Sequence, residues 1–127
     1  MPDFKRKNNV VEMISVSAVN SANNLDAKLI TVSTMGGYTA RKISNFRPDM
    51  PILAQCINEE LARSLALYYG VYSKVMPVLS TTDEILEESL KNAKEFMDLN
   101  KGDIVVITGA SSVLENRSTN LLKIEKI

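Results

Sequence analysis

The chain has 127 residues, 45% of them hydrophobic, and its 15 basic and 15 acidic side chains leave no net charge. This length is enough for one domain with its own core, and the balanced charge gives no electrostatic basis for binding nucleic acid or an anionic membrane. With one cysteine and no histidine, the chain can form neither an internal disulfide nor a Ser-His or Cys-His nucleophile system.

The chain carries no sign of export or of membrane insertion. It has no run of about 20 apolar residues and no signal-peptide pattern. The single thiol, Cys56, lies in the apolar run 52–57, which predicts a buried structural cysteine in a reducing compartment. Residues 1–9 are polar and basic, which is typical of a tail or an interdomain segment. We therefore expect a cytoplasmic protein whose domain covers residues 10–127.

The first predicted elements are a helix and a buried strand. Apolar residues recur at three- and four-residue spacing from Val10 to about Leu25, and Asn8 or Asn9 can cap this helix. Its small side chains predict close packing against a sheet or another helix; they are Ser15, Ser17, Ala18, Ser21 and Ala22. The run from Lys28 to Ser33 is nearly continuous in apolar residues, which predicts a strand covered on both faces.

A turn rich in glycine and threonine follows this strand directly. It reads Thr34-Met-Gly-Gly-Tyr-Thr39 and leads into an amphipathic segment. The N–H groups at a helix start lack internal partners, and the helix dipole places partial positive charge there. Gly36 and Gly37 can adopt positive φ and let a phosphate come close, while Thr34 and Thr39 add hydroxyl groups. The sequence therefore predicts an anion site in this turn.

The middle of the chain predicts two helices around a second strand. A short helix from Thr39 to Phe46 is followed by prolines and then by a strand from Ile52 to about Ile57. Asn58 can cap the next helix. The expected inner stripe of that helix contains Leu61, Leu65 and Tyr68 or Tyr69, and the expected stop is Gly70.

The last third predicts one long helix between strands. A short strand is expected around residues 74–78, and Thr81 with Glu84 forms a capping box for a helix that runs to about Leu99. Its expected inward residues are Ile85, Leu86, Leu90, Ala93 and Met97. A fourth strand over 104–109, a polar loop over 110–119 and a last strand over 120–127 complete the chain.

Alternating strands and helices predict an α/β domain with a mostly parallel sheet and helices on both faces. Ligands bind beyond the carboxyl ends of such strands, so the loops 34–39 and 110–119 should share one rim. The connection of about ten residues before the last strand is short for a parallel crossover, so we expect that strand to be antiparallel.

Five segments, in this order and spacing, resemble the C-terminal domain of pyruvate kinase over about residues 8–127. They lie at 9–22, 27–41, 46–54, 67–78, and 101–109 with 119–124, and include Gly-Gly-Tyr-Thr-Ala-Arg and Lys-Gly-Asp-Ile-Val-Val. The resemblance implies a three-layer α/β/α sandwich with a five-stranded mixed sheet, mostly parallel with the last strand antiparallel.

The resemblance also implies a regulatory function. In pyruvate kinase, which transfers phosphate from phosphoenolpyruvate to ADP in glycolysis, this domain binds a phosphorylated effector and contributes a subunit interface. The implied partners are a sugar phosphate such as fructose 1,6-bisphosphate or a nucleotide, and further copies of the chain, a dimer of this domain within a tetramer of the parent enzyme. The family's Mg²⁺ and K⁺ bind in a catalytic barrel, so this chain alone is expected to hold no cofactor, no metal and no catalytic residue.

The implied phosphate contacts are Thr34, Met35, Gly36, Gly37, Tyr38, Thr39, Arg117 and Thr119. Met35 and Gly36 stand where the common bacterial loop has glutamate and serine, so one hydroxyl donor is lost. The loop before Thr119 lacks the family's glycine and carries Glu115, which repels phosphate, beside Arg117, which is either a charged donor or a solvated side chain.

Two other classes of function remain beside the regulatory domain. The alternative is a stand-alone interaction domain that has kept the fold and lost effector binding. A small enzyme would need acid–base groups that converge in a cleft. The acidic pairs at 59–60, 83–84 and 87–88 are instead typical of helix starts and a solvated helix face.

Overall fold

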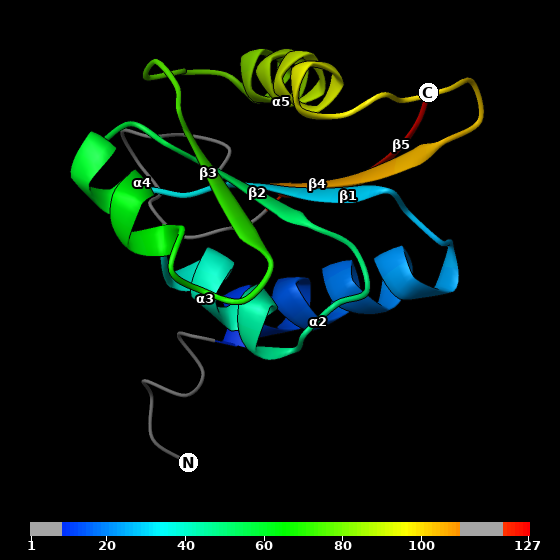
Figure 1. The fold of residues 1–127 in the computed structure, drawn as a ribbon, viewed down its shortest axis with the longest axis horizontal. Coiled ribbons are helices and arrows are strands. Elements are labelled where there is room, and N and C mark those ends of the chain that lie inside the picture. Colours follow the sequence, from blue (N-terminus) through cyan, green and yellow to red (C-terminus); the bar gives the residue numbers. More distant parts are fainter. Residues whose placement is uncertain (1–8, 110–120) are drawn as a thin grey trace.

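The computed structural model describes residues 9–109 and 121–127, in which helices and strands alternate along the chain (Figure 1). The helices are α2 (Asn9–Asn24), α3 (Tyr38–Asn45), α4 (Glu59–Leu65) and α5 (Thr82–Phe96). The strands are β1 (Leu29–Ser33), β2 (Ile52–Cys56), β3 (Val71–Val75), β4 (Ile104–Gly109) and β5 (Leu121–Lys126). Within these residues, no helix is both long and apolar enough to cross a lipid bilayer.

The strands form one mixed sheet in the order β3-β2-β1-β4-β5. The first four strands are parallel, and β5 runs antiparallel to β4, with Val106 opposite Ile124. The mostly parallel sheet and the antiparallel last strand are therefore confirmed. β1 lies in the centre, and β5 lies at one edge of the sheet.

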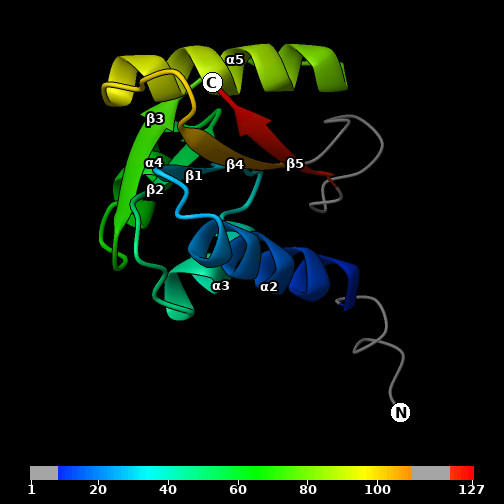
Figure 2. The same ribbon diagram turned by 90° about the vertical axis from the view of Figure 1, so that its right-hand side faces the viewer.

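Helices cover both faces of the sheet, as predicted. Figure 2 shows α5 on one side of the strands and α2 with α3 on the other. Leu65 of α4 belongs to the same buried cluster as Ala18 of α2 and Ile43 of α3, so α4 shares their face. The molecule is thus a three-layer α/β/α sandwich, and among the described residues α5 is the one helix on the second face.

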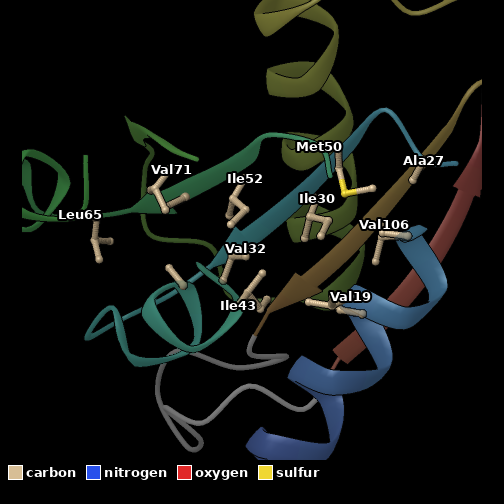
Figure 3. Close-up of a cluster of buried hydrophobic side chains, with 14 residues drawn as sticks. Val19, Ala27, Ile30, Val32, Ile43, Met50, Ile52, Leu65, Val71 and Val106 are labelled. Atoms are coloured by element: carbon tan, nitrogen blue, oxygen red, sulfur yellow. The ribbon is translucent and has the colours of Figure 1, made fainter. Parts of the chain in front are cut away.

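The core consists of two clusters separated by the sheet. The larger one faces α2, α3 and α4, and Figure 3 shows its members Ile30, Val32, Ile52, Val71 and Val106 converging from four strands. The smaller one lies under α5 and contains Leu29, Leu53, Ala93, Val105 and Ile107. Every residue of β1 and β2 is buried, which explains why their sequences are nearly continuous in apolar residues.

Three of the five small side chains of α2 are buried as expected, whereas Ser17 and Ser21 are half-buried. Ser15, Ala18 and Ala22 are fully buried, and α2 contacts both α3 and β4. Asn9 is the first residue of the helix rather than a residue before it, and Asn8 lies outside the described residues.

The prediction for α4 is wrong beyond Leu65. Tyr68 or Tyr69 was expected on its inner stripe, but the helix ends at Leu65 and both rings are exposed. The N–H of Tyr68 donates to the carbonyl of Leu65, three residues back, which tightens the chain into a turn. Contacts with α3 and the turn after it fix Tyr69: its carbonyl accepts from Ser44 Oγ at 2.7 Å, and the Arg47 guanidinium lies 4.6 Å from its ring centre.

Two further boundaries differ from expectation. Gly70 has a positive φ of 70° as predicted for a stop residue, but it belongs to the turn before β3 rather than to the end of α4. The third strand begins at Val71 and ends at Val75, so it lies earlier in the chain than the expected strand around residues 74–78.

Side-chain contacts attach β3 to α5. Lys74 and Glu95 form an ion pair, 2.7 Å from Nζ to Oε1. The rings of Tyr72 and Phe96 pack against each other, with 5.1 Å between their centroids.

The capping box at the start of α5 is confirmed. Thr81 Oγ1 accepts from the N–H of Glu84 at 3.1 Å, and Glu84 Oε1 accepts from the N–H of Thr81 at 3.1 Å. Hydrogen bonds from Ser80 and Thr81 hold the pKa of Glu84 below its usual range. The stability that this carboxylate contributes is therefore present above its unfolded pKa of about 4.3 and is lost as the pH falls through the lowered value.

We expect Thr81→Ala to lower the free energy of unfolding by about 1 kcal/mol, because it leaves the N–H of Glu84 without its capping oxygen. Urea denaturation at pH 7 measures the change. Thr82→Ala is the matched control, since Thr82 lies inside the first turn, and it should change stability by less than about 0.5 kcal/mol. Equal losses for the two variants would contradict the capping role.

Candidate functional site: the loop between β1 and α3

The loop after β1 lies where the order of strands reverses. From β1 the chain proceeds through α3 to β2 and β3 on one side of the sheet, whereas β4 joins β1 on the other side. Open α/β sheets bind ligands at such a reversal, beyond the carboxyl ends of the strands. Ser33 and Gly109, the last residues of β1 and β4, are register partners, so these two strands end at the same rim of the sheet. The predicted neighbour of this loop, residues 110–119, lies outside the described residues.

Gly109 allows a close approach between these two strand ends. A Cβ at this position would lie 2.9 Å from Ser33 Cβ, which is closer than such carbons approach in proteins. The ends of β1 and β4 therefore lie too close together to accommodate a side chain at position 109, which would push the two strands apart.

The loop is closed by its own hydrogen bonds. The N–H of Thr34 donates to the carbonyl of Gln55 at 2.9 Å, and Thr34 Oγ1 accepts from the N–H of Gly37 at 2.8 Å. The N–H of Gly37 is therefore already hydrogen-bonded within the loop. The Thr34 hydroxyl accepts a hydrogen bond within the loop, in addition to any bond that it donates.

The two glycines of the loop differ. Gly37 has a φ of 86° and is the N-cap of α3, whereas Gly36 is absent from the positive-φ residues of the described chain. Of the two glycines that can adopt positive φ, only Gly37 does so. Gly36 instead leaves open space, because a Cβ there would meet no atom within 4 Å.

Arg41 brings a positive charge to the loop, although it was not among the expected phosphate contacts. Its Nη1 donates to the carbonyl of Gly36 at 3.3 Å. The signal was its spacing, because a residue four positions after Gly37 lies one helical turn above the N-cap. Lys42, the next residue, is instead paired with Glu12, 2.6 Å from Nζ to Oε1, and this hydrogen bond raises the pKa of Lys42.

The other predicted contacts lie in different environments. Tyr38 is exposed at the start of α3, whereas Thr39 is 4% exposed, so its side chain belongs to the interior. Met35 is half-buried beside a cavity of about 20 Å³ that is also lined by Met76, Leu79 and Ile85. This cavity has room for one water molecule at most. Arg117 and Thr119 lie outside the described residues.

Metal ligands and the single thiol are the candidate reactive groups in the described part of the chain. This part contains no group of three or more His, Cys, Asp or Glu side chains that could hold a metal ion. Cys56 is fully buried, its Sγ donates to the carbonyl of Asn58 at 3.5 Å, and burial raises the pKa of the thiol. Because the thiolate is the reactive form, Cys56 is a structural residue, as expected.

The glycines provide a direct test of the loop geometry. We expect Gly37→Ala to cost at least about 1 kcal/mol, since it places an L side chain at positive φ with its Cβ 2.8 Å from Arg41 Nη1. Gly36→Ala is the matched control and should change stability by less than about 0.5 kcal/mol. Thermal or urea denaturation measures both, and a greater loss for Gly36→Ala would refute the assignment of Gly37 as the N-cap.

Comparison with known proteins identifies the fold family. Residues 12–125 match the family described as pyruvate kinase, alpha/beta domain. The chain is 39% identical over 118 residues to the pyruvate kinase of Geobacillus stearothermophilus, covering 93% of this chain and 20% of that protein. It is 40% identical over 116 residues to the pyruvate kinase of Clostridium perfringens, covering 91% of this chain and 24% of that protein.

Solved structures agree with the sequence matches. The structure described as Cryptosporidium parvum pyruvate kinase in complex with ADP matches with a TM-score of 0.79 and 35% identity, covering 92% of this chain and 23% of that one. The chain thus spans about a fifth to a quarter of the length of these relatives. The resemblance noted in the sequence is confirmed, and the chain belongs to the pyruvate kinase alpha/beta domain family.

Proposed function

We propose that this chain is the regulatory C-terminal domain of a pyruvate kinase, which binds a phosphorylated effector and contributes a subunit interface. The observation that carries the proposal is the loop over residues 34–39, which combines a glycine N-cap, the Arg41 guanidinium and a position at the strand reversal in a domain of this family. The effector would be a sugar phosphate or a nucleotide.

The electrostatics of the loop favour an anion. The N–H of Tyr38 has no acceptor inside α3, because the first N–H groups of a helix lie beyond its hydrogen-bond ladder, and the helix dipole adds partial positive charge there. Arg41 donates to a neutral carbonyl, so this contact leaves its charge available. Because Gly36 leaves open space, a phosphate can approach the backbone at this point.

Catalysis would belong to the rest of the parent enzyme. This chain covers about a fifth of the length of its bacterial relatives, and it contains no histidine for acid–base work. We propose that phosphate transfer, with its Mg²⁺ and K⁺, takes place on a barrel outside this chain in the cytoplasm. The isolated chain would then have no phosphotransferase activity.

The proposed subunit interface is the edge of the sheet at β5. Within the described residues, β5 pairs with β4 on one side and with no strand on the other. An edge strand presents unpaired N–H and C=O groups, and Ile124 adds an apolar side chain that is 45% exposed. A second copy related by a two-fold axis would cover both.

We expect fructose 1,6-bisphosphate or inorganic phosphate to bind the chain, and Arg41→Met to weaken that binding by about tenfold, since a charge-assisted hydrogen bond contributes about 1.5 kcal/mol. Isothermal titration calorimetry at low ionic strength measures the affinity. Arg63→Met is the matched control, because it removes the same charge from the exposed face of α4, and it should leave the affinity nearly unchanged.

The outcome of this titration separates the two readings of the chain. Absence of binding by sugar phosphates, nucleotides and phosphate alike would reject the effector site and favour the alternative, an interaction domain that has lost its ligand. Equal weakening by Arg41→Met and Arg63→Met would indicate a non-specific electrostatic effect of surface arginines rather than a site at the loop.

For the interface, we expect the chain to sediment as a dimer at about 100 μM, well above a micromolar Kd, and Ile124→Lys to shift it to monomer, because a charged side chain blocks pairing of sheet edges. Val75→Lys is the matched control, since Val75 is equally exposed, at 45%, on the opposite edge strand. A monomeric wild-type chain, or dissociation by Val75→Lys alone, would refute an interface at β5.

A further inference from the structure

A chain of buried polar side chains runs between the sheet and α5. Gln55 and Ser89 are fully buried, Asn92 is 1% exposed and Ser33 is 5% exposed. They lie in the same layer as the apolar cluster under α5. Burial of polar groups in such a layer is costly unless they are hydrogen-bonded, so their mutual contacts determine whether the layer is stable.

Gln55 is the centre of this network. Its Nε2 donates to Ser33 Oγ at 3.1 Å and to Ser89 Oγ at 3.0 Å, and its Oε1 accepts from Asn92 Nδ2 at 2.7 Å. Two of the three partners, Ser89 and Asn92, lie one helical turn apart on α5. The orientation of the Gln55 amide is therefore fixed largely by α5.

The same residue also holds the base of the loop. The backbone carbonyl of Gln55 accepts from the N–H of Thr34 at 2.9 Å, while its side chain holds Ser33. Ser33 ends β1, and Thr34 in turn accepts from the N–H of Gly37 at the start of α3. Hydrogen bonds, joined to one another through the covalent structure of Gln55 and Thr34, thus connect α5 to the N-cap of α3.

We propose that Gln55 is a positioning residue for the loop over 34–37, through which the placement of α5 controls the geometry of the anion site. The proposal rests on the proposed function for the purpose of the site, but the coupling itself concerns the chain without ligand. An apolar side chain at position 55 would leave Ser33, Ser89 and Asn92 without their shared partner. Because coupling between two sites is reciprocal, an anion held at the loop would also restrain α5.

Amide hydrogen exchange of the ligand-free chain tests the coupling. We expect Gln55→Met to accelerate exchange at the N–H groups of Thr34 and Gly37 by about fivefold beyond any change at the amides of β4, which report global stability. Leu53→Met is the matched control, since Leu53 is buried on the same face of the same strand, and it should change the loop amides no more than those of β4.

Ser89→Ala provides a second variant with a smaller change in volume. It removes one hydrogen bond to Gln55 from the α5 side and makes no contact with the loop in the network described above. The proposal predicts faster exchange at Thr34 and Gly37 in this variant as well. Unchanged loop exchange in Ser89→Ala, or in a folded Gln55→Met, would overturn the coupling.

Titration with inorganic phosphate then separates the two proposals. If the wild-type chain binds no phosphate, sugar phosphate or nucleotide, the proposed function fails, and the coupling is decided by the exchange of the ligand-free chain alone. If phosphate binds, Gln55→Met should weaken it by at least about fivefold while Leu53→Met should not. Unaltered phosphate affinity in Gln55→Met would refute the positioning role.

Discussion

The parallel pairing of β1 with β4 is the contact on which the rest of the structure depends. β1 is the central strand, hydrogen-bonded to β2 on one edge and to β4 on the other, and all its residues are buried. The two core clusters share this strand, since Ile30 and Val32 face α2 and α3 while Leu29 faces α5. The reversal of strand order at this pair also places the loop after β1 at the position where α/β sheets bind ligands.

Much of the fold follows from local patterns in the sequence. The buried strands are visible as apolar runs, the start of α5 as Thr81 with Glu84, and the antiparallel last strand from the short connection before it. Where a predicted helix or strand boundary was wrong, contacts between residues far apart in the sequence determine the structure instead. Tyr69 continues the helical spacing of α4, yet Ser44 and Arg47, more than 20 residues earlier, hold it in a turn instead.

The candidate site was only partly predictable for the same reason. The sequence indicated the loop and its glycines, but only the backbone of the folded loop, which the bond from Gly37 to Thr34 closes, shows which glycine adopts positive φ. Gln55 appears in the sequence as a polar interruption of an apolar strand, and its partners Ser89 and Asn92 come from a helix more than 30 residues later. Hydrogen-bond partners that distant leave no periodic signal in the sequence.

The order of strands has a consequence for how the chain acquires its structure during synthesis. α2, β1, α3, β2, α4 and β3 are synthesised before α5 and β4, and they can associate through contacts close in sequence. The second edge of β1 is then without a partner, because β4 follows only after α5. Such a long-range pairing is slow to form, and an open edge on a central apolar strand is prone to wrong association. Completion of the sheet therefore requires the last third of the chain, and truncation before β4 would leave the central strand, β1, unpaired along one edge.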